Sequence, residues 1–243
     1  MPASSHQWIV DSLHSFDTHD VGSILPPIFD AYARVFHPGY IYSGASSGRI
    51  PISWRDVARV HNRVAHPTMA WGSLVGTWSS NSLIGYRSGP KYQSPDEGSL
   101  PADLASELGS ILAKFTDTPK KVFYALWHGW ADVQGGVVNA ELLELPHRTM
   151  YVIQGSIENV TNPFNLTVPR TANLWWPDDR KWCVATEIDL LTTYVGGSHD
   201  CVKAVLDSDI LEAMPATDNQ RITWDADKIN PLPDNPIVGS IRL

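Results

Sequence analysis

Apolar side chains recur at helical spacing in two clear runs of the sequence. The first run follows Pro101, which suits the first turn of a helix, and consists of Leu104, Leu108, Ile111, Leu112 and Phe115. The second run follows Ser53, a favourable N-cap residue, and consists of Trp54, Val57, Ala58, His61 and Ala65. The pattern therefore predicts one helix from Pro101 to Phe115 and another of about three turns that begins at Trp54 and ends before Pro67.

Short runs rich in β-branched and aromatic residues predict strands instead. Such runs cover residues 121–127, 148–153 and 182–189, and a last, shorter one covers 222–224. Gly196 and Gly197 predict a turn, after which Ser198 is expected to cap a helix that buries Val202, Val205 and Leu206.

Helices and strands interleave without the regular alternation of a doubly wound fold. We therefore expect an α+β fold with a mainly antiparallel sheet and several packed helices. The 243 residues form a single globular domain, 1–243, in this interpretation. Residues 87–101 are dense in turn-forming residues, and this loop is where the domain would divide.

Composition and charge exclude several classes of protein. With 43% hydrophobic residues, 18% charged residues and a net charge of −8, the chain can form a core and lacks the cationic excess of nucleic-acid-binding proteins. No apolar run reaches the length of about 20 residues that spans a membrane, and residues 1–7 lack the features of a secretory signal. The two cysteines, Cys183 and Cys201, are too few for a disulfide framework. We expect a cytoplasmic protein that binds neither nucleic acid nor membranes.

Two segments in the C-terminal half of the chain resemble segments of other proteins. Residues 173–189 read NLWWPDDRKWCVATEID, and residues 193–198 read TYVGGS. Together with RVFHP at 34–38 and LWHGW at 126–130, they resemble an uncharacterised, mainly actinobacterial protein family. This resemblance implies one intact unit in a bacterial cytosol, and it brings no activity, cofactor or catalytic residue with it.

Glu187 and Asp189 are the main candidates for chemistry. Side chains alternate along a strand, so the predicted strand 182–189 places both acids on one face, with their Cα atoms about 6.5–7 Å apart. Cys183 and Ala185 lie beside them on that face and leave room for a ligand. The pair suits acid/base work or a divalent cation, although no cofactor is predicted outright. The alternative is that they are solvated, or that one of them pairs with Arg180 or Lys181.

Ten tryptophans are the most unusual feature of the composition. Indole rings build cores, but they also line recognition surfaces. Adjacent residues on a strand point to opposite faces, so Trp175 and Trp176 are not expected in the same core layer. One of them is expected near a cleft or an interface, where Arg180 stacks or binds a carboxylate. The proposed recognition surface consists of Trp127, Trp130, Trp175, Trp176 and Arg180.

Three functions stay open at this point. The leading hypothesis is a non-catalytic binding module whose Trp-rich surface recognises a protein or a small-molecule ligand. The second is a hydrolase in which Glu187 and Asp189 act as acid and base or as metal ligands, with help from His128 at the end of a strand. The third is a structural or assembly subunit.

Overall fold

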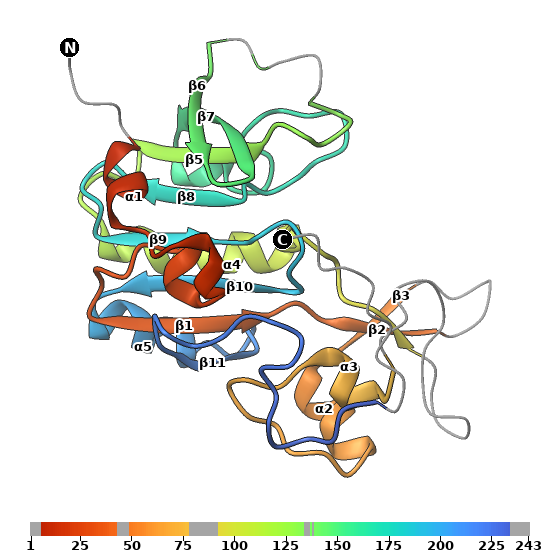
Figure 1. Ribbon diagram of the computed structural model, residues 1–243. Coiled ribbons are helices and arrows are strands. Elements are labelled where there is room, and N and C mark those ends of the chain that lie inside the picture. Colours follow the sequence, from red (N-terminus) through yellow and green to blue (C-terminus); the bar gives the residue numbers. More distant parts are fainter. Residues whose placement is uncertain (1–5, 43–48, 78–91, 134–136, 138, 234–243) are drawn as a thin grey trace.

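The computed structural model describes residues 6–42, 49–77, 92–133, 137 and 139–233, and an eight-stranded antiparallel sheet forms its centre (Figure 1). The spatial order of its strands is β11-β1-β10-β9-β8-β5-β7-β6. They are β1 (Ala31–Phe36), β5 (Val122–Trp127), β6 (Glu141–Leu145), β7 (Arg148–Gly155), β8 (Leu174–Pro177), β9 (Trp182–Ala185), β10 (Thr192–Gly197) and β11 (Ala213–Ala216). A smaller antiparallel sheet, in the order β3-β2-β4, contains β2 (Gly39–Tyr42), β3 (Arg49–Ile52) and β4 (Tyr92–Gln93). The predicted α+β class is confirmed.

Helices cover both faces of the large sheet. They are α1 (Gln7–Ser12), α2 (Trp54–Val60), α3 (Trp71–Val75), α4 (Ala102–Leu112) and α5 (His199–Leu206), with short 3-10 turns η1 (Phe16–Thr18), η2 (Val21–Ser23), η3 (Ala113–Phe115) and η4 (Ile157–Asn159). Figure 1 shows α4 and α5 behind the sheet and α1 in front of it, while α2 and α3 lie beside the smaller sheet. Among the described residues, no helix has the length and apolar character needed to cross a bilayer.

Alternation along the strands divides the core into two layers. Trp175 and Trp182 pack on the side of α4 and α5, whereas Trp176 and Cys183 pack on the side of α1. The expectation that neighbouring tryptophans point to opposite faces is thus confirmed. Both Trp175 and Trp176 are buried, however, with exposed fractions of 1% and 0%. The prediction that one of them stays near a cleft is wrong, because helices cover both faces of the sheet at this point.

The helix predicted at 101–115 and the strands predicted at 121–127 and 148–153 are confirmed by α4 with η3, β5 and β7. The helix that begins at Trp54 is shorter than predicted and ends at Val60. Asn62 adopts a left-handed backbone conformation with φ of 54°, and the backbone N–H of Arg63 donates to the carbonyl of Ala58. This arrangement terminates a helix, so Ala65 lies beyond it and is exposed.

Two expectations near the C-terminal half need correction. Gly196 and Gly197 extend β10 and pair with β1 rather than forming a turn. A β carbon on Gly196 would lie 2.5 Å from the ring of Phe29, so this strand position requires glycine. The helix that follows is confirmed, with the Ser198 side chain accepting a hydrogen bond from the backbone N–H of Cys201. Residues 222–224 form no strand.

The predicted strand 182–189 is correct only for its first half. β9 ends at Ala185, and the backbone N–H of Leu190 donates to the carbonyl of Glu187, which closes a turn. Asn173 stabilises the exit from the strand, because its carbonyl and its side-chain amide both bind the backbone of Thr186. Glu187 and Asp189 therefore lie in a turn, and strand alternation does not determine where they point.

Candidate functional site

Glu187 and Asp189 meet at a single arginine, Arg148, at the start of β7. The Nε of Arg148 donates to Oε1 of Glu187 at 2.7 Å, and its Nη2 donates to Oδ2 of Asp189 at 2.7 Å. The predicted strand face does not bring the two acids together; they meet through a shared cation instead. Lys181, one of the two suggested partners, binds Asp117.

The carboxylates around Arg148 outnumber their cation. Arg148 and Glu187 are almost completely buried, and the second oxygen of Glu187 accepts the backbone N–H of Asp189. Burial, followed by the charge of Glu187, raises the pKa of Asp189 even though Arg148 opposes the shift. Burial and the charges of Asp189 and Glu187 likewise raise the pKa of Glu97. Within the described ranges, no three His, Cys, Asp or Glu side chains converge as metal ligands.

A pocket of about 440 Å³ adjoins this ion pair. It lies between residues 10–24, which follow the course of α1 to η2, and the large sheet, with the turn between β6 and β7 on one side. Much of its wall is apolar and includes Leu13, Phe16, Ile24, Leu145, Met150 and Leu174. Arg148 and Glu187 form part of the wall, whereas Asp189, His128 and Arg180 are not among the described residues that line it.

His14 is a pocket residue that the sequence reasoning missed. Its Nδ1 lies 3.1 Å and 3.2 Å from the two carboxylate oxygens of Asp20. Asp20 also caps η2, because its side chain accepts the backbone N–H of Ser23. Gly22 packs against the imidazole ring, since a β carbon there would lie 2.4 Å from Nδ1 of His14. Residues 13–23 have no helical or strand periodicity, and the one local signal was Asp20 as an N-cap before Val21.

The residues of the predicted aromatic surface lie in three separate places. Trp127, the last residue of β5, and Trp130 remain partly exposed, with their ring centroids 5.5 Å apart. Arg180 is exposed, and its guanidinium lies 5.5 Å from the ring of Trp8. Trp175 and Trp176 are in the core, so the five residues do not form one continuous surface. His128 is exposed next to Trp127.

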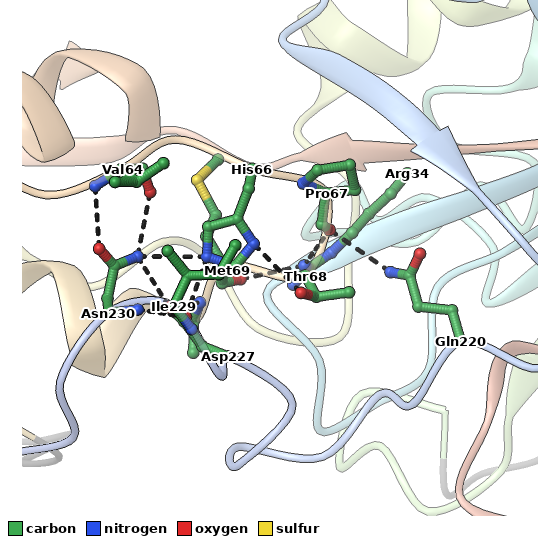
Figure 2. Close-up of polar contacts among 11 residues, drawn as sticks. Arg34, Val64, His66, Pro67, Thr68, Met69, Gln220, Asp227, Ile229 and Asn230 are labelled. Carbon is green, nitrogen blue, oxygen red and sulfur yellow. Dashed lines mark hydrogen bonds and ion pairs between the residues drawn. The ribbon is translucent and has the colours of Figure 1, made fainter.

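Another histidine–aspartate pair, which is buried, ties the C-terminal segment to the chain after α2 (Figure 2). Nε2 of His66 lies 2.9 Å from Oδ1 of Asp227, whose carboxylate also accepts hydrogen bonds from three backbone N–H groups and the side chain of Asn230. Asn230 in turn makes two hydrogen bonds with the backbone of Val64. The oxygens of Asp227 are thus fully occupied, and this cluster holds two segments together.

A third histidine, His37, is completely buried at the end of β1. Its Nδ1 donates to the carbonyl of Asp96 at 2.7 Å, and its Nε2 accepts from the hydroxyl of Thr193 at 2.9 Å. Burial is the main cause that lowers the pKa of His37 from 6.5 to about 4. The folded protein therefore keeps this ring neutral at pH values where the unfolded chain protonates it.

This difference predicts an acid-sensitive stability. The unfolded state binds the extra proton between the two pKa values, so the contribution of His37 is complete near neutral pH and is lost as the pH falls from 6.5 toward about 4. The loss between about pH 7 and about pH 5 is roughly 2 kcal/mol. Urea unfolding of the wild type and of His37→Gln at both pH values measures it, and the variant should lose this part of the pH dependence. Parallel pH profiles for the two proteins would contradict the expectation.

Comparisons with known proteins add no relative to this picture. No protein-family model, no curated protein and no solved structure matches the chain.

Proposed function

We propose that this protein binds a small, largely apolar organic molecule in the pocket beside Arg148 and Glu187. The observation that carries the proposal is the pocket itself. Its volume of about 440 Å³ lies within the range of ligand sites, and mostly apolar walls with a few polar groups are typical of such sites. This keeps the binding function expected from the sequence but moves its centre from an indole surface to a partly open pocket.

The charges around the pocket favour an uncharged ligand over an anionic one. The guanidinium of Arg148 already binds Glu187 and Asp189, so it offers little attraction to a carboxylate or phosphate. Asp17, which lines the pocket and is exposed, adds a negative charge at its rim. An anion would therefore meet more repulsion than attraction here.

The hydrolase alternative has less geometric support. Both carboxylate oxygens of Glu187 are engaged, one by Arg148 and the other by the backbone of Asp189. A general base needs a lone pair within reach of the substrate, and His128 lies outside the pocket lining. A buried ion pair with Arg148, which lies in the pocket wall together with Glu187, is the better role for these acids.

Ser15 offers a direct test, because it lines the pocket, is exposed and caps η1 without a side-chain hydrogen bond. We expect the neutral fluorescent probe N-phenyl-1-naphthylamine to bind the wild type saturably. In Ser15→Trp the indole would occupy pocket volume and weaken binding about tenfold, equivalent to about 1.4 kcal/mol. Fluorescence titration measures both affinities.

Ser15→Ala is the matched control and should bind the probe like the wild type, since it removes only a hydroxyl at the rim. Circular dichroism should show that all three proteins are equally folded. Absence of saturable binding to the wild type, or equal affinity in Ser15→Trp, would overturn the proposal.

A further inference from the structure

We infer that this pocket selects ligands that carry an uncharged O–H or N–H donor, which Nε2 of His14 accepts. The inference rests on the proposed function and names the chemical class of its ligand. Hydroxylated aromatic compounds are the simplest members of this class.

Asp20 determines which nitrogen of His14 carries the proton. A carboxylate only accepts hydrogen bonds, so Nδ1, at 3.1 Å and 3.2 Å from its oxygens, must be the protonated nitrogen. In the neutral ring, Nε2 is then the acceptor. Within the part of the chain that the structure describes, Nε2 has no hydrogen-bond partner, and the His14 side chain is 36% exposed.

The ring is also held in place. Its face packs against Gly22, and the backbone N–H of His14 donates to the carbonyl of Gly22 at 2.9 Å. The carboxylate of Asp20 is itself buried and anchored by the N–H of Ser23 at 2.9 Å. A positioned acceptor loses little conformational entropy when a ligand binds, which favours a directional hydrogen bond.

The buried polar groups of the wall already have partners. The Asn173 side chain donates to two carbonyls and accepts the N–H of Trp127. Thr186 shares a hydrogen bond with Thr193, and the hydroxyl of Ser23 donates to the carbonyl of Asp20. Ser15, His147 and Asp17 are exposed at the rim, where water competes for them. His14 is therefore the group best placed to accept a hydrogen bond from a donor on the ligand.

Two ligands that differ by one hydroxyl test this inference. We expect 2-naphthol to bind the wild type about 5- to 10-fold more tightly than naphthalene. This ratio corresponds to the net free energy that one hydrogen bond usually contributes. Competition against N-phenyl-1-naphthylamine measures the ratio. In His14→Phe the ratio should fall to about 1, while the affinity for naphthalene is retained.

Asp20→Asn gives a second variant that keeps the ring in place. Asparagine is an equally good N-cap, but its amide can donate to Nδ1 and so transfer the ring proton to Nε2. The preference for 2-naphthol should then disappear, and quinoline, which carries an acceptor, should gain over naphthalene. Asp11→Asn removes the same charge at an exposed position of α1 that does not line the pocket, and it should leave the preference unchanged.

The outcomes separate the two proposals. Equal affinities of the wild type for 2-naphthol and naphthalene would overturn the role of His14 while leaving the pocket as a binding site. A preference that survives in both His14→Phe and Asp20→Asn would also overturn it. Failure of the wild type to bind the probe and both ligands would instead overturn the proposed function together with this inference.

Discussion

Arg148→Met is expected to lower the free energy of unfolding by about 3–5 kcal/mol. Without the guanidinium, the carboxylate of Glu187, which is 6% exposed, stays buried beside Asp189 with no cation between them. Removal of one partner from a buried ion pair costs far more than the pair contributes in total, because the remaining charge is poorly solvated. Urea denaturation at neutral pH measures the loss.

Two further variants make the expectation specific. Arg59→Met removes an arginine of which 79% of the side chain is exposed and should change stability by less than about 1 kcal/mol. Arg148→Met combined with Glu187→Gln removes the buried unpaired charge and should recover part of the loss. If Arg148→Met costs no more than Arg59→Met, the ion pair does not stabilise the pocket wall.

Asp227→Ala is expected to have an effect of similar size, about 3–5 kcal/mol. It leaves the backbone N–H groups of Ala70, Ile229 and Asn230, together with the ring of His66, without their acceptor in a buried region (Figure 2). Each unsatisfied buried donor is costly, although the individual costs do not add. Asp207→Ala, at an exposed carboxylate paired with Lys203, is the control and should cost less than about 1 kcal/mol.

The same cluster has a defined response to acid. Burial alone would raise the pKa of Asp227, but hydrogen bonds from Asn230, Ala70 and Ile229 outweigh it and lower the pKa. Because the folded pKa lies below the unfolded one, this stabilisation is present above about pH 4 and is lost as the pH falls through the folded value. Asp227→Asn should remove this part of the acid dependence. If its unfolding profile below about pH 4 matched that of the wild type, Asp227 would not be the group responsible.

The candidate site combines local features with contacts that join distant parts of the chain. Glu187 and Asp189 are predictable as a pair because they are two residues apart, and this closeness holds in a turn as well as in a strand. Their partner Arg148 and the pocket residue His14 come from other parts of the chain. No spacing in the sequence connects these positions, so the pocket could not be predicted.

By itself, the sequence determined those elements that short-range periodicity defines. Leu104, Leu108 and Ile111 lie on one side of α4, and the alternation along β9 separates Trp182 from Cys183, because each pattern depends on backbone geometry over a few residues. Tertiary structure decided which faces were covered. Helices on both sides of the sheet bury Trp175 and Trp176, and residues 10–24 and the β6–β7 turn form walls of the pocket. These outcomes depend on long-range strand order and packing, which single-residue patterns do not encode.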